Sequence, residues 1–141
     1  MLILAAADGS ECADRAIDMA ATLAKATHAK LLVVTVGDNF AGEDVRKLAR
    51  AEGGVAEALE LISNQILQQA RERALRQGAP SVEVQVAWGD PAEAIMDTAR
   101  RSKAGAIVVG RRGRGRLTGL LLGSVSQKLV SLAPCPVVVV P

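Results

Sequence analysis

Short apolar runs alternate with longer helical patterns along the whole chain, and this alternation constrains the fold more than any other feature of the sequence. Two runs, Met1 to Ala7 and Leu31 to Val36, are strand-length and almost continuously apolar, as is typical of strands buried on both faces. Two further apolar runs, Ala106 to Val109 and Val137 to Val140, are predicted to be the fourth and fifth strands. A fifth run, Val82 to Val86, alternates valine with polar residues. This pattern predicts an edge strand, with one face less buried than the other.

Residues that start and stop helices separate these runs. Ser10 is expected to cap a first helix, and Asp90, followed by Pro91 and Glu93, is expected to cap a later one. The first predicted helix follows Ser10 and ends near residue 26. The second covers 43 to 77, with a break at 53–54 and its main part from residue 55. Two further helices are predicted at 91 to about 102 and at 124 to 132.

This order predicts an α/β fold of Rossmann-like type. We expect a single domain over residues 1–141, with a doubly wound parallel sheet of five strands and helices on both faces. The predicted strand order is 3-2-1-4-5. The sheet then changes direction between the first and fourth strands, where open α/β sheets bind ligands. Asp8 and the loop that begins at Gly110 follow these two strands.

The loop after the fourth strand is rich in glycine and arginine, and it leads into a helix start (Val108 to Lys128, VVGRRGRGRLTGLLLGSVSQK). Backbone N–H groups of such a loop, with the helix N-terminus and its charge of about +0.5, favour an anion. The sequence therefore predicts a phosphate cradle. The alternative is an ordinary solvated surface connection.

The predicted phosphate-binding groups come from both ends of this loop. Glycine permits positive φ and close approach of an anion, and guanidinium groups suit phosphate. The residues in this set are Gly110, Arg112, Gly113, Arg114, Gly123, Ser124, Val125 and Ser126. Backbone N–H groups of Gly113, Gly123 and Ser124 are expected to hold phosphates, with the hydroxyls of Ser124 and Ser126 as further donors.

The spacing Gly110-x2-Gly113-x9-Gly123-Ser124 resembles the G-x2-G-x9-G-[S/T] signature of the ATP-binding branch of the universal stress protein family. Asp8-Gly9-Ser10 and the segment from Ala133 to Val140 are also similar to this family's sequences. The resemblance implies an ATP-binding α/β protein, usually a homodimer, which commonly pairs through the segment Val137 to Val140.

The same resemblance implies roles for three residues at the ends of the first two strands. Asp8 is expected to face the adenosine part of ATP, although its alternative role is to form the turn before the first helix. Val36 is expected to offer backbone groups to adenine, and Ala7 to line the floor of the pocket.

We expect a regulatory or stress-response protein because no catalytic residues can be assigned. The chain has no P-loop lysine signature, no evident general base and no carboxylate pair for Mg²⁺. Any Mg²⁺ ion is expected to be held mainly by the phosphates of ATP. Slow ATP hydrolysis or self-phosphorylation at Ser124 or Ser126 stays open.

A basic-loop nucleic-acid-binding module is the alternative, but one Trp, one Phe, no Tyr and a net charge of +2 make it less favourable. A dinucleotide-dependent oxidoreductase lacks its glycine turn after the first strand.

The histidine and the two cysteines do not form a catalytic or metal-binding pattern in the sequence. His28 is expected to be exposed in a turn, and Cys135 to be a packed thiol, and neither cysteine belongs to a metal-binding or disulfide pattern. No apolar run approaches the roughly 20 residues of a membrane span, and the N-terminus lacks the basic region of a signal peptide. We therefore expect a cytoplasmic protein without a membrane partner.

Overall fold

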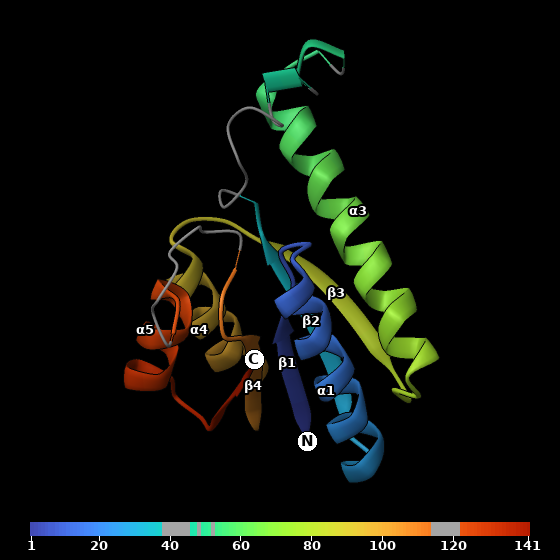
Figure 1. Cartoon of the computed structure of the whole chain (residues 1–141), viewed down its shortest axis with the longest axis vertical. Coiled ribbons are helices and arrows are strands. Elements are labelled where there is room, and N and C mark those ends of the chain that lie inside the picture. Colours follow the sequence, from blue (N-terminus) through green and yellow to red (C-terminus); the bar gives the residue numbers. More distant parts are fainter. Residues whose placement is uncertain (38–45, 48, 52, 114–121) are drawn as a thin grey trace.

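The computed structural model describes residues 1–37, 46–47, 49–51, 53–113 and 122–141. Strands and helices alternate through these residues (Figure 1). Their bounds are β1 Leu2–Ala6, α1 Glu11–Thr27, β2 Lys30–Val36, α3 Val55–Arg76, β3 Val82–Ala87, α4 Pro91–Ser102, β4 Ala106–Gly110, α5 Ser124–Leu132 and β5 Val137–Val140.

The strands form one parallel sheet in the order β3-β2-β1-β4-β5, which confirms the predicted topology. In the centre of the sheet, Leu4 of β1 is in register with Leu32 of β2 and with Ile107 of β4. The polar strand β3 lies at one edge, as predicted, and β5 lies at the other. The sheet changes direction between β1 and β4, so the carboxyl ends of these two neighbours meet at the switch point.

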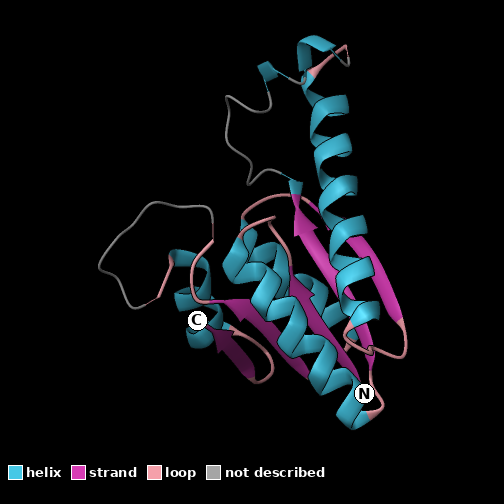
Figure 2. Ribbon diagram, turned by 45° about the vertical axis from the view of Figure 1, so that its right-hand side comes forward, coloured by secondary structure: helices cyan, strands magenta, loops and turns pink. Residues whose placement is uncertain are grey.

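Helices cover both faces of the sheet (Figure 2). The pair α1 and α3 packs on one face, and α4 and α5 pack on the other. Neighbouring residues of β2 divide accordingly: Leu31 and Val33 join the apolar cluster under α1 and α3, whereas Leu32 and Val34 join the cluster under α4 and α5. The expectation of strands buried on both faces is therefore confirmed for β2, and also for β1, whose Ile3 and Leu4 join opposite clusters.

The predicted caps fix the starts of two helices. The Ser10 hydroxyl accepts a hydrogen bond from the Ala13 N–H at 3.2 Å, and the Asp90 carboxylate accepts one from the Glu93 N–H at 3.1 Å. Each such cap contributes about 1 kcal/mol. They set the direction in which α1 and α4 leave the carboxyl edge of the sheet.

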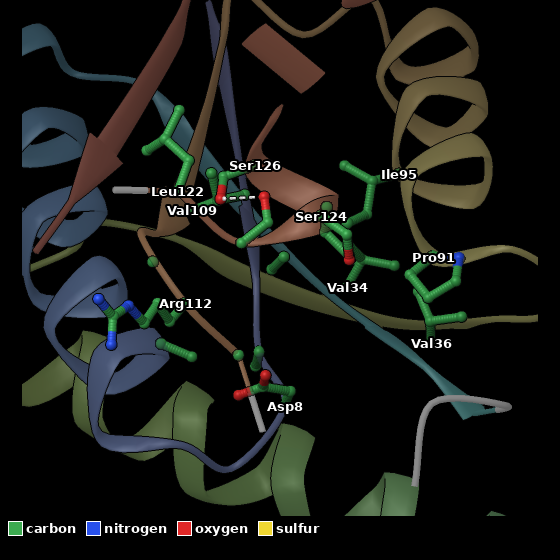
Figure 3. A pocket seen from close by; sticks show the side chains of 17 residues that line it. Asp8, Val34, Val36, Pro91, Ile95, Val109, Arg112, Leu122, Ser124 and Ser126 are labelled. Carbon is green, nitrogen blue, oxygen red and sulfur yellow. Dashed lines mark hydrogen bonds between the residues drawn. The ribbon is translucent and has the colours of Figure 1, made fainter. Parts of the chain in front are cut away.

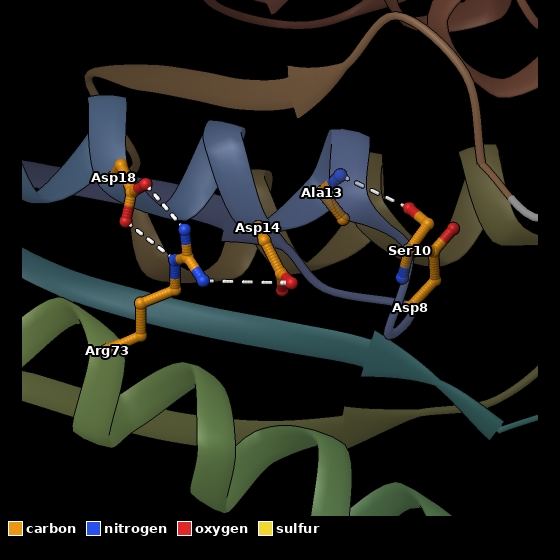
Figure 4. A network of polar contacts seen from close by, with 6 residues as sticks. All are labelled: Asp8, Ser10, Ala13, Asp14, Asp18 and Arg73. Atoms are coloured by element: carbon orange, nitrogen blue, oxygen red, sulfur yellow. Dashed lines mark hydrogen bonds and ion pairs between the residues drawn. The ribbon is translucent and has the colours of Figure 1, made fainter.

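The long helix α3 is joined to α1 by an ion-pair network (Figure 4). Arg73 donates two hydrogen bonds to the Asp18 carboxylate at 2.7 and 2.8 Å and lies 3.8 Å from an Asp14 oxygen. The bonds to Asp18 raise the pKa of Arg73. A partly exposed pair contributes about 1 kcal/mol or less, whereas full burial of Ile17 contributes roughly 1.5–3 kcal/mol. Apolar packing therefore supplies most of the α1–α3 attraction, and the network fixes the alignment.

Several local expectations are confirmed, and part of one predicted helix lies outside the described residues. His28 is exposed and ends α1 with φ 55°, and Cys135 packs against the cluster under α4 and α5, where burial raises the pKa of its thiol. The predicted break before α3 occurs at Gly53, with φ 91°. The earlier part of the predicted 43–77 helix, at residues 43–45, 48 and 52, lies outside the described residues. Among the helices that the structure describes, none has the length and apolar character needed to span a membrane.

Candidate functional site

A cavity of about 210 Å³ opens at the carboxyl ends of β1 and β4, at the switch point of the sheet (Figure 3). Its walls come from the ends of β1, β2 and β4, the starts of α1, α4 and α5, and the described parts of the loop after β4. The lining residues are Ala6, Ala7, Asp8, Ala13, Val34, Val36, Pro91, Ile95, Val109, Gly110, Arg112, Gly113, Leu122, Gly123, Ser124, Val125 and Ser126.

The cavity brings together every predicted binding residue that the structure describes. Arg114 is the exception, because it lies outside the described residues. Ala7 directly follows β1 and Val36 ends β2. The other predicted residues come from the end of β4 and the loop after it, and from the segment that leads into α5. Residues up to 119 positions apart in the sequence therefore line one space.

Hydrogen bonds hold the two arms of the loop together. The Arg111 N–H donates to the Val140 carbonyl at 2.6 Å, and the Arg111 carbonyl accepts from the Gly123 N–H at 2.8 Å. The Ser126 hydroxyl also donates to the Arg111 carbonyl, at 2.8 Å. One residue, Arg111, thus ties the end of β5 to the start of α5.

Gly110, Gly113 and Gly123, the described glycines of this region, do not have positive φ, which corrects the sequence-based expectation, and each is crowded to a different degree. The residues with positive φ are elsewhere, and Gly123 has φ −72°. A Cβ on Gly110 would lie 2.9 Å from the Cys12 carbonyl carbon and 3.1 Å from the Ala13 nitrogen, and one on Gly113 would lie 2.7 Å from Asp8 Oδ2. Close approach to the first turn of α1 is the physical reason for Gly110, whereas Gly113 is crowded by the Asp8 side chain in the turn before α1.

Asp8 occupies the position that joins β1, α1 and the loop. Its Oδ1 accepts a hydrogen bond from the Ser10 N–H at 2.9 Å, which is the turn-forming role, and its other oxygen faces Gly113. The Asp8 side chain also lines the cavity (Figure 3). The turn-forming role and a place in the cavity are therefore compatible.

The two serines of α5 differ in accessibility. Ser126 is 3% exposed and its hydroxyl donates to loop carbonyls, so in this structure it supports the loop. Ser124 is exposed at the first position of α5 and lines the cavity. Of the two predicted hydroxyl donors, Ser124 is the one that faces the open space. Arg112 lies on the opposite side, beside the start of α1, where its N–H donates to the Cys12 thiol at 3.5 Å.

One wall of the cavity is apolar, and the sequence reading missed most of it. Val34 and Val36 on β2 face Pro91 and Ile95 on α4 across this end of the space (Figure 3). Two sequence signals could have indicated this wall: Val34 and Val36 are two residues apart and so share one face of β2, and Pro91 and Ile95 are four residues apart and so share one face of α4. Just beyond Val36, the half-exposed Trp88 covers Gly37, because a Cβ on Gly37 would collide with the indole ring.

The described residues contain no group of three or more His, Cys, Asp or Glu side chains placed to hold a metal ion. The polar groups at the cavity are instead backbone N–H groups, hydroxyls, one carboxylate and a guanidinium. Backbone N–H groups at the start of α5 suit an anion, and the valines, proline and isoleucine suit a flat apolar group.

An open parallel sheet with a cavity at its switch point, lined by glycines and a helix N-terminus, places this chain among α/β proteins of the Rossmann-like class. Comparison with known proteins makes the assignment more specific. The model of the universal stress protein family matches residues 1–141, and the chain belongs to this family.

Individual relatives agree with this assignment. A universal stress protein of Thermus aquaticus, encoded in the QAH/OAS sulfhydrylase 3′ region, is 41% identical over 147 residues, covering 98% of this chain and 96% of the relative.

Two solved structures are also similar. A universal stress protein in complex with cAMP is 29% identical, with a TM-score of 0.74 and coverage of 100% and 97% of the two chains. The universal stress protein of Archaeoglobus fulgidus in complex with dAMP is 25% identical, with a TM-score of 0.71 and coverage of 100% and 98%.

Proposed function

We propose that this protein binds ATP in the cavity at the switch point and acts as a nucleotide-dependent regulatory protein of the stress response. The observation that carries the proposal is the division of one cavity into an apolar end and an end lined by glycines, hydroxyls and a helix N-terminus. Adenine requires the first of these environments and a phosphate chain requires the second.

The base is proposed to lie between β2 and α4. Val34, Val36 and Ile95 provide apolar contacts on both sides of that end, and the backbone of Val36 offers hydrogen bonds to the edge of adenine. Ala7 forms the floor. Asp8, which lies between the apolar end and the loop, accepts hydrogen bonds from the ribose hydroxyls.

The phosphates are proposed to lie against both arms of the loop. Gly113 and the first turn of α5 line this part of the cavity, where first-turn N–H groups lack intrahelical acceptors and the Ser124 hydroxyl is available as a donor. The Gly123 N–H, which was also expected to hold phosphate, donates to the Arg111 carbonyl instead. Arg112 contributes positive charge. A Mg²⁺ ion would be held mainly by the phosphates, because the described residues offer the single carboxylate of Asp8 at the cavity.

Two of the solved relatives support an adenine nucleotide as the ligand, since one is a complex with cAMP and the other a complex with dAMP. The glycine spacing Gly110-x2-Gly113-x9-Gly123-Ser124 favours ATP within this class. We assign no catalytic role to any residue. Slow hydrolysis or self-phosphorylation at the exposed Ser124 is the secondary activity that the position of this hydroxyl favours.

The proposal is tested by identifying what the purified protein carries. We expect mass analysis after denaturation to detect an adenine nucleotide, and calorimetry of the stripped protein to detect saturable ATP binding. Absence of both, with millimolar ATP in the titration, would overturn the proposal. RNA binding that is sensitive to salt and unaffected by ATP would instead favour the nucleic-acid-binding alternative.

The proposed working form is a cytoplasmic homodimer paired through β5. This strand is at a sheet edge, and Val137, Val138 and Val139 are partly exposed there. An exposed apolar edge invites pairing with another strand, and a two-fold axis would satisfy both copies. Light scattering is expected to give twice the 14.6 kDa chain mass at micromolar concentration. A monomer mass over a hundredfold range of concentration would contradict this prediction.

A further inference from the structure

Cys12 lies where α1, β5 and the loop after β4 meet. Its thiol donates a hydrogen bond to the Val140 carbonyl at 3.3 Å and accepts one from the Arg112 N–H at 3.5 Å. These partners are 128 and 100 positions away in the sequence. The thiol therefore connects the first turn of α1 with the end of β5 and with the loop.

The surroundings of Cys12 differ from those of a cysteine that only fills a core. Cys12 is partly buried and belongs to neither of the two apolar clusters, whereas Cys135 packs against the cluster under α4 and α5. The backbone of Cys12 is also the surface against which Gly110 packs, with no room for a Cβ. Both the main chain and the side chain of this residue thus face the loop.

The Val140 carbonyl accepts hydrogen bonds from the Cys12 thiol and from the Arg111 N–H. The Arg111 carbonyl in turn accepts one from the Gly123 N–H. The Arg112 N–H is directed to the thiol, so the peptides on both sides of Arg111 are oriented. Gly113, which lines the cavity, follows directly. The thiol therefore contacts the backbone one residue before Gly113, and a change at the thiol alters the backbone at the proposed phosphate end of the cavity.

We propose that Cys12 is a positioning residue for the phosphate end of the cavity. Its thiol holds the loop backbone in the orientation that binds phosphate, without contacting the nucleotide. The inference rests on the proposed function, and it goes further by separating the residues that bind phosphate from the residue that orients them.

The test compares ATP with adenosine, which lacks phosphates, in calorimetry of Cys12→Ala and Cys12→Ser. We expect Cys12→Ala to bind ATP about three- to tenfold more weakly, the effect of losing one or two hydrogen bonds, and to bind adenosine as the wild type does. Cys12→Ser keeps a donor and acceptor and should regain most of the ATP affinity. Cys135→Ala is the matched control, and its ATP affinity should be unchanged.

The outcomes separate this inference from the proposed function. If the wild type binds no ATP, the proposed function itself fails. If it binds ATP and Cys12→Ala binds equally well, only the role of Cys12 is refuted. Equal losses for ATP and adenosine would mean a general structural role and would also refute it. Cys12→Val, which keeps the bulk without hydrogen bonds, replaces Cys12→Ala if that variant does not fold, with the same expected results.

Discussion

Replacement of Gly123 by aspartate is expected to abolish ATP binding while the fold keeps its stability. Gly123 is the N-cap of α5, with φ −72° and ψ 169°, a conformation open to any residue, and no side chain caps this helix. A Cβ here would lie 3.3 Å from the Arg111 carbonyl oxygen, a tight contact, but aspartate is a favoured N-cap that offsets this cost, so unfolding free energy should change by less than about 1 kcal/mol. Its carboxylate, however, would occupy the proposed anion site. Repulsion of about 3–4 kcal/mol at 4–5 Å predicts ATP affinity at least a hundredfold lower.

Gly123→Asn separates charge from size in this experiment. Asparagine has the same shape and also caps helices, so it competes for the same N–H groups without repelling phosphate. We expect it to bind ATP at least tenfold more tightly than Gly123→Asp. Gln69→Glu adds the same charge on the exposed side of α3 and should leave ATP affinity unchanged. Equal affinities of the Asp and Asn variants would contradict a phosphate position beside Gly123.

Replacement of Gly110 by alanine is expected to destabilise the fold strongly. The new Cβ would lie 2.9 and 3.0 Å from the carbonyl carbon and oxygen of Cys12, and 3.1 Å from the Ala13 nitrogen. These are backbone atoms of a helix, so they yield only if α1 moves away from β4. Such overpacking costs about 1–3 kcal/mol, to be measured as a lower urea midpoint with an unchanged slope.

Gly105→Ala is the matched control at the other end of β4. Its Cβ would approach the Met1 side chain at 2.6 Å, but this side chain is flexible and its residue is 68% exposed. The side chain can move away, so a loss below about 0.5 kcal/mol is expected. If both variants lose the same stability, contact of the loop with α1 does not explain the glycine at position 110.

The fold was accessible from the sequence because its signals are local. Buried strands such as Leu31 to Val36 are recognisable from composition, and the caps at Ser10 and Asp90 mark helix starts within three residues. Strict alternation of strands and helices then leaves few sheet orders. The polar residues within Val82 to Val86 identified the edge strand, although burial along it does not follow side-chain type, since Val84 is exposed like Glu83.

The candidate site was accessible where it follows strand ends and where the glycine-rich loop leads into α5. Asp8 and Gly110 end neighbouring strands, so topology brings them together. Ile95 and Cys12 were missed because their contacts depend on how helices settle on the sheet, which no local pattern records. The glycine spacing correctly indicated positions that need a small residue. It could not distinguish a conformational requirement from the close approach of α1, which the three-dimensional packing reveals.

The indole of Trp88 lies over Gly37, one residue beyond the valine that ends β2 at the proposed base-binding end. The chain has one tryptophan and no tyrosine. Its ultraviolet emission therefore comes from a single fluorophore located next to the region where adenine is proposed to bind. The protein carries an intrinsic optical reporter, and ligand titrations can be followed without attaching a dye.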